Sequence, residues 1–76
     1  MEIHPSAPKH GIADEDIEHA VKNAMAIDDQ ALPRAYLGPA QSADLLEVVT
    51  VIRADAPELA IHAMKMRPKY QRLLEG

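Results

Sequence analysis

The sequence predicts a small α+β domain, and three features of its 76 residues indicate that class. An amphipathic segment near the start follows a run of acidic residues, segments rich in β-branched residues occupy the middle of the chain, and a second helical segment closes it. Strands grouped between separate helices are typical of α+β folds. We therefore expect an antiparallel three- to four-stranded sheet packed against an N-terminal helix at about 14–25, with a short C-terminal helix at about 68–75.

The first helix is expected to begin shortly after Gly11, which is the kind of residue that ends a preceding turn. Asp14 and the two acids that follow it occupy the first turn, where the helix dipole favours negative charge. Apolar residues then recur at helical spacing through Met25. The polar stretch 27–33 is typical of a turn.

Two strands are predicted in the middle of the chain. The run 34–37 has strand character and is expected to end at Gly38 and Pro39. The segment 45–53 is rich in Val and Ile, so both of its faces should be covered and it should lie in the centre of the sheet.

A third strand at 59–64 should follow a turn at 55–58. Strict alternation places Leu59, Ile61 and Ala63 on one face of this strand, and Ala60, His62 and Met64 on the other. Pro68 suits the first turn of the closing helix, because the N–H that proline lacks has no partner at that position.

Composition excludes several classes of protein. The chain has no Cys, so it has no disulfide framework and no thiolate metal site. Its longest apolar run, 43–52, is interrupted by Asp44 and Glu47 and is too short to span a bilayer. The first residues lack the basic and apolar regions of a secretion signal. We expect a single soluble, cytoplasmic domain over 1–76.

The apolar residues are mostly small. They make up 47% of the chain, yet there is no Phe or Trp and there are two Tyr. A core of small side chains returns little free energy against the cost of ordering the backbone. We therefore expect a partner protein or self-association.

Charge is unevenly distributed along the chain, which has a net charge of −4. The first thirty residues are strongly acidic, whereas half of the basic residues lie within 65–72. A compact basic segment can bind phosphates, although a solvated helix face is the more ordinary explanation of such a pattern.

Four stretches have a characteristic order and spacing. They are Lys9-His10-Gly11-Ile12 before the acidic helix, Arg34-Ala35-Tyr36-Leu37-Gly38, Leu45-Leu46-Glu47-Val48-Val49, and Ile61-His62-Ala63-Met64-Lys65-Met66-Arg67-Pro68-Lys69-Tyr70. In these stretches the chain resembles the BrnT-like toxins of bacterial toxin–antitoxin operons, which belong to the wider RelE-like group of small ribonucleases. The resemblance implies a RelE-like fold, RNA cleavage or arrest of translation, and a cognate antitoxin as partner.

The chain also departs from this family. Relatives usually have a longer, basic first helix, whereas this sequence has Pro5 and Pro8 and room for scarcely one turn. Many relatives have an Arg where Met64 stands, which allows for weaker or lost catalysis. The sheet surface that the missing helix would cover is the predicted partner-binding region.

Metal-independent RNA cleavage needs a base near the 2′-hydroxyl, cations on the phosphate and a proton for the leaving 5′-oxygen. His62, Lys65 and Arg67 are the catalytic candidates, because imidazole titrates near neutral pH and the two cations stabilise a phosphate. The alternative interpretation of His62 is an ordinary surface residue on a strand. The alternative interpretation of Lys65 and Arg67 is ordinary charged residues in a turn between a strand and a helix.

Arg34, Lys69, Tyr70 and Arg72 are the RNA-binding candidates. Lys69 and Arg72 would follow neighbouring phosphates, and Tyr70 would stack on a base or donate a proton. Packing within the closing helix is the more ordinary role for Tyr70. Arg34 could reach the same phosphate, or could be an edge charge that discourages aggregation.

No metal or other cofactor is predicted. The four His residues lack the short spacings that zinc ligands on one helix or turn require.

Two functions remain open. The first is a toxin that acts on mRNA, with or without the ribosome, as a metal-independent endoribonuclease-like inhibitor of translation and is neutralised by a cognate antitoxin. The second is a catalytically degenerate binding module that pairs with an antitoxin-like partner or self-associates.

Overall fold

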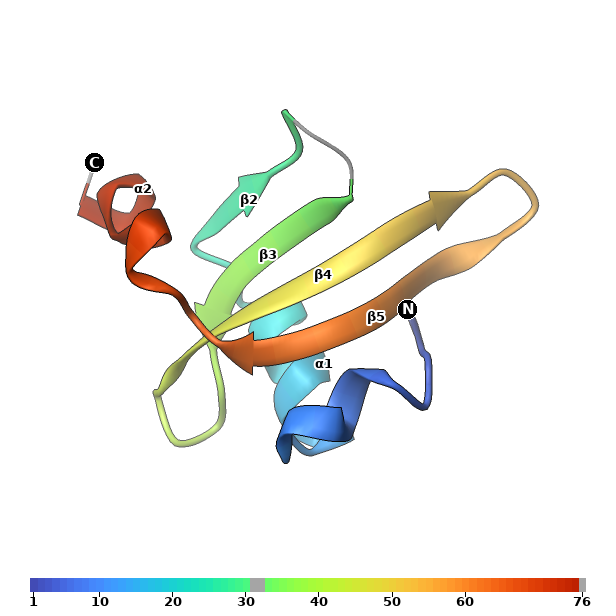
Figure 1. Ribbon diagram of the computed structural model, residues 1–76, viewed down its shortest axis with the longest axis horizontal. Coiled ribbons are helices and arrows are strands. Elements are labelled where there is room, and N and C mark those ends of the chain that lie inside the picture. The colour runs from blue at the N-terminus through green and yellow to red at the C-terminus, as the bar shows by residue number, and fades with distance from the viewer. Residues whose placement is uncertain (31–32, 76) are drawn as a thin grey trace.

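The computed structural model describes residues 1–30 and 33–75. Its strands form one sheet in the order β1-β5-β4-β3-β2, with helix α1 against one face (Figure 1). The strands are β1 (Glu2–Ile3), β2 (Ala26–Asp28), β3 (Arg34–Pro39), β4 (Leu45–Arg53) and β5 (Ala56–Lys65). The helices are the 3-10 turn η1 (Ala7–His10), α1 (Asp14–Lys22), the 3-10 turn η2 (Pro68–Tyr70) and α2 (Gln71–Glu75).

The α+β class is confirmed, whereas the expected antiparallel sheet of three to four strands is wrong. Strands β2 to β5 pair antiparallel, but β1 pairs with β5 in parallel, so the five-stranded sheet is mixed. Glu2 and Ile3 lie opposite Leu59 and Ala60. A strand of two residues is too short to show the alternation from which strands are predicted.

Helix α1 begins at Asp14 as expected and ends at Lys22, earlier than expected. The chain leaves the helix because the backbone N–H of Met25 donates to the carbonyl of Leu37, next to the pairing of β2 with β3. The stretch 27–33 is expected to be a turn, but its first residues belong to β2. Residues 31–32 of this stretch lie outside the described residues. The closing helix, η2 followed by α2, matches the expected 68–75.

Strand β4 has the bounds that the sequence predicts. Strand β3 does not stop at Gly38 but continues through Pro39. Gly38 is needed where α1 approaches the sheet, because a Cβ on this residue would lie 2.1 Å from the carbonyl oxygen of Ala20. The turn before β5 is confined to 54–55, so β5 is longer than predicted.

A bulge in β5 changes which residues face α1. Val49 lies opposite His62 and Thr50 lies opposite Ala60, so β5 has one extra residue, Ile61, at this point. Ala60 and Ala63 are consequently both buried in the core that contacts α1. The alternation predicted for 59–64 is therefore wrong, because a bulge inverts the two faces beyond it.

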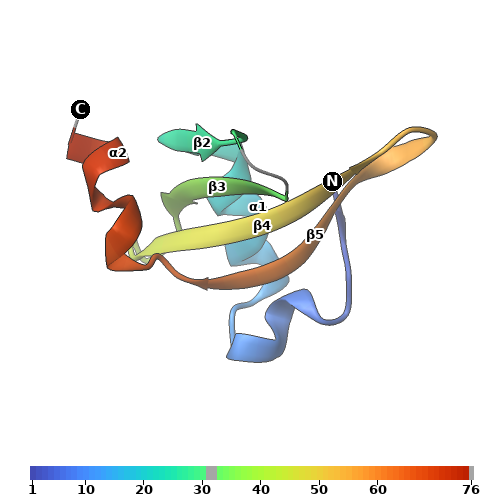
Figure 2. The same cartoon turned by 45° about the horizontal axis from the view of Figure 1, so that its top comes forward.

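The two faces of the sheet are covered differently. The core lies on the α1 face, where Ile17 of the helix packs with Leu46 and Val48. On the opposite face, called here the open face, Tyr70 and Leu74 pack near Leu37 and cover one end. The β4–β5 hairpin extends past β3 at the other end, away from α2 (Figure 2).

No helix within residues 1–30 and 33–75 is both long and apolar enough to cross a membrane.

Candidate functional site

The basic residues of 65–72 follow the end of β5. Lys65 is its last residue and lies opposite Leu46, so the segment leaves the sheet at the end opposite the β4–β5 hairpin. The four basic side chains are exposed: Lys65, Arg67, Lys69 and Arg72. This end of the sheet therefore has a concentrated positive charge in an otherwise acidic chain.

Arg67 is bound to a buried carboxylate. Glu47 of β4 is 0% exposed. Its Oε1 accepts hydrogen bonds from the backbone N–H of Arg67 at 3.1 Å and from Nε at 3.1 Å, and its Oε2 accepts from Nε at 3.1 Å and from Nη2. Hydrogen bonding to Glu47 and its negative charge raise the pKa of Arg67 above its usual value.

Tyr70 lies beneath the same cationic residues. The residue is 8% exposed and packs with Met66 and Leu37. The Lys69 ammonium is 4.9 Å from the ring centroid and the Arg67 guanidinium is 5.9 Å from it, within the range of cation–π attraction. The structure therefore gives Tyr70 the packing role and uses its ring to hold two cations.

His62 is exposed on the open face of the sheet. It lies opposite Val49, and Glu47 lies opposite Met64. His62 and Glu47 are thus diagonal neighbours, whose Cα atoms are typically about 7–8 Å apart. His62 and the residue that holds Arg67 therefore lie on the same face of the sheet.

Two of the predicted residues lie elsewhere. Lys65 pairs with Leu46, whose side chain is in the core beside α1, so Lys65 projects from the face opposite His62. Arg34 lies opposite Thr50, toward the hairpin end of the sheet. The structure brings Arg67, Lys69 and Tyr70 together, with Arg72 following on α2. His62 lies on the same open face, whereas Lys65 and Arg34 lie apart from that group.

Arg34 belongs instead to a polar cluster on the α1 face. Its Nη1 donates to the Tyr36 hydroxyl at 3.4 Å and lies 3.7 Å from Glu58, while Nη2 lies 3.7 Å from Asp29. The Tyr36 hydroxyl donates to Glu58 at 2.7 Å, and Thr50 donates to the same carboxylate. Burial raises the pKa of the Tyr36 phenol above its usual value, and the hydrogen bond to Glu58 also raises it.

The sequence prediction missed Glu47 and Glu58 as partners of the two arginines. Glu47 carries a visible signal, because it is an acid inside a strongly apolar strand sequence. An acid at such a position is expected to have a cationic partner. Its partner depends on the pairing of β4 with the chain that follows β5, which no local pattern specifies.

The described residues contain no group of three or more His, Cys, Asp or Glu side chains that could hold a metal ion. A scan of protein-family models, a search of curated proteins and a search of solved structures each found no match.

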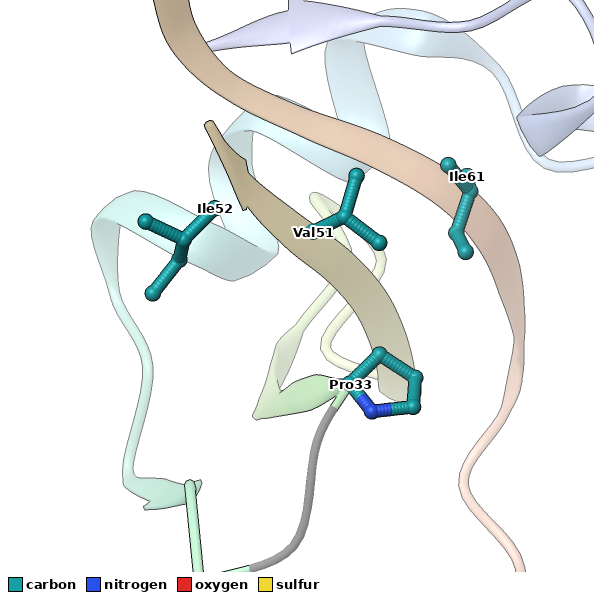
Figure 3. Close-up of a pocket in the computed structure, with 4 residues that line it drawn as sticks. All are labelled: Pro33, Val51, Ile52 and Ile61. Atoms are coloured by element: carbon teal, nitrogen blue, oxygen red, sulfur yellow. The ribbon is translucent and has the colours of Figure 1, made fainter. Parts of the chain in front are cut away.

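A shallow apolar depression of about 470 Å³ lies near the β4–β5 hairpin. Figure 3 shows the residues that line it, which come from β4, β5 and the position before β3: Pro33, Val51, Ile52 and Ile61. Ile52 is 56% exposed, which is high for a large apolar residue.

Proposed function

We propose that the chain is the toxin of a bacterial toxin–antitoxin pair, a metal-independent endoribonuclease-like inhibitor of translation of the BrnT-like, RelE-related kind. The observation that carries the proposal is the placement of the Arg67 and Lys69 cations around Tyr70, on the same open face of the sheet on which His62 is exposed. An imidazole and two cations are the groups that metal-free RNA cleavage requires. A cognate antitoxin would neutralise the protein by covering this group.

In the proposed reaction, the 2′-oxygen of a ribose attacks the adjacent phosphorus and the bond from phosphorus to the 5′-oxygen breaks. The products are a 2′,3′-cyclic phosphate and a 5′-hydroxyl. His62 either removes the proton of the 2′-hydroxyl or donates one to the 5′-oxygen, and water performs the other transfer. Arg67 and Lys69 stabilise the negative charge that grows on the phosphate oxygens.

Lys65 and Arg72 have a supporting role in this proposal. They flank the group along the chain and are exposed. Their positive charges attract the RNA backbone and make the affinity fall as salt concentration rises.

Expression in a bacterial host without the antitoxin should arrest growth, and H62Q should relieve the arrest. Glutamine stays polar but cannot transfer a proton at neutral pH. H10Q is the matched control, because His10 is also exposed but lies on η1. Purified wild-type protein should also cleave RNA in the presence of a chelator. Normal growth at confirmed expression, together with intact RNA, overturns the proposal.

A second candidate function is a non-catalytic module that binds an antitoxin-like partner protein. Two observations favour it: the Nε and Nη2 donors of Arg67 are engaged by Glu47, and an apolar depression lies near the β4–β5 hairpin. The partner would place apolar side chains against Ile52 and Ile61.

Co-expression with the product of a short adjacent reading frame tests this second function. Size-exclusion chromatography with light scattering should show a complex that I52D disrupts. L73D is the control, because Leu73 is similarly exposed, at 51%, but lies on α2. A wild-type protein that stays monomeric beside the co-expressed product contradicts this function, and a homodimer in place of the complex identifies self-association instead.

A further inference from the structure

Glu47 occupies an unusual position for a carboxylate. It is fully buried in the central strand β4, and the side chain that neutralises it, Arg67, is 52% exposed. Replacing a buried ion pair by well-packed apolar residues is often neutral or stabilising. Stability alone therefore does not explain a buried acid at position 47.

The hydrogen bonds to Glu47 hold one edge of the Arg67 guanidinium. Glu47 engages Nε and Nη2, and it also fixes the backbone of Arg67 through the N–H group. Tyr70 also lies beside the guanidinium, and its interaction with Arg67 adds to the rise in the pKa of Arg67. The Tyr70 ring lies 5.9 Å from the guanidinium carbon and further restricts it.

A held guanidinium has an advantage in binding an anion. A free Arg side chain loses rotamer freedom when it binds, which costs about 0.5–1.5 kcal/mol for a side chain of this length. Arg67 has already lost that freedom in the folded protein. Glu47 holds the guanidinium on the open face of the sheet, the face on which His62 also lies.

We propose that Glu47 is a positioning residue, which holds Arg67 in one orientation so that the guanidinium donates to a bound phosphodiester. This inference rests on the proposed ribonuclease function. Glu47 does not touch the RNA and acts through Arg67.

If Glu47 acted on Arg67 only through its charge, removing that charge would favour RNA binding. Its negative charge is adjacent to Arg67 and weakens the attraction of the guanidinium for phosphate. E47Q would then strengthen RNA binding and leave kcat unchanged. If Glu47 positions Arg67, E47Q lowers kcat by on the order of 100-fold, because a displacement of about 1 Å has an effect of that size, and KM does not rise.

A double-mutant cycle with R67K tests whether Glu47 acts through Arg67. Lysine keeps the charge but has no planar fork for Glu47 to hold. R67K should lower kcat by about as much as E47Q, and the double variant should be no slower than R67K alone. A further loss of kcat in the double variant, equal to that of E47Q alone, would overturn the inference.

A measurement on the wild-type protein avoids any failure of E47Q to fold. The Nε–H group of Arg67 should give a resolved NMR signal, protected from exchange, that shifts when a mixed-sequence 2′-deoxy oligonucleotide is added. A signal averaged with those of mobile arginines contradicts the inference. If wild-type protein cleaves RNA but Arg67 is mobile, the inference alone fails. If the signal is protected but no RNA is cleaved, the proposed function fails.

Discussion

The contact between α1 and β3 at Gly38 provides the sharpest test of the fold. In G38A, the new Cβ would lie 2.1 Å from the oxygen and 3.0 Å from the carbon of the Ala20 carbonyl, and 3.0 Å from the Cα of Ala24. All three are backbone atoms, two within α1 and one just beyond its end, so no side-chain rotation relieves the overlap. Helix α1 must move away from the sheet by about 1 Å.

The cost of this change can be related to the total stability. Overpacking a core costs about 1–3 kcal/mol, and a backbone obstacle belongs at the upper end of that range. A domain of this size is expected to have about 4–11 kcal/mol of stability in total. Since 1 kcal/mol corresponds to about 4–8 °C in a small domain, a loss of about 3 kcal/mol lowers Tm by about 12–24 °C.

Thermal unfolding followed by circular dichroism measures the effect. G11A is the control, because Gly11 has a φ of 82° but an added Cβ would have no neighbour within 4 Å. Its cost is therefore limited to the strain of a left-handed residue, about 1–2 kcal/mol. A20G should not rescue G38A, since the carbonyl of residue 20 remains. A Tm of G38A within about 5 °C of wild type, or rescue by A20G, refutes the reasoning.

Two further substitutions test the polar cluster and the core. Y36F removes hydrogen bonds to Glu58 and should cost about 1.5–3 kcal/mol at neutral pH, measured by urea unfolding. The pKa of Tyr36 is raised in the folded protein, so the stability that its neutral hydroxyl contributes is complete below pH 10 and is lost as the pH rises through the folded-state pKa. Y36F has no hydroxyl to ionise, so it should lose less stability than wild type as the pH rises above 10. An identical alkaline loss in both proteins would exclude this role. L37A should cost about 2–5 kcal/mol, because Leu37 is 0% exposed. I52A should change stability by about 0.5 kcal/mol or less, and equal losses in the two variants would contradict the assigned core.

Local sequence patterns predicted the elements whose signals are local. The acids at the start of α1, the Val and Ile residues of β4 and Pro68 at η2 each mark an element within a few residues. The bulge at Ile61 was not predictable, because it depends on how β5 pairs with β4. It decides that Ala60 and Ala63 face the same side.

The candidate site likewise combines a feature that is local in the sequence with contacts that are not. The sequence identifies the basic segment by composition alone, but it does not specify which basic side chains form ion pairs and which do not. Arg67 is held because Glu47 lies beneath it, and Lys65 points to the other face because of its register with Leu46. The sequence allows Arg34 to reach the same phosphate or to be an edge charge, whereas its pairing with Thr50 and its ion pair with Glu58 place it toward the hairpin end of the sheet.

The parallel pairing of β1 with β5 affects how the chain folds. Glu2 contacts Leu59 across most of the length of the chain, whereas β3, β4 and β5 are joined to their neighbours by short connections. Contacts between distant residues are slow to form, because a long loop must close first. We expect the three central strands to assemble first and β1 to join last. Until it joins, the outer edge of β5 has unpaired backbone groups, and aggregation or strand exchange between two chains would begin there.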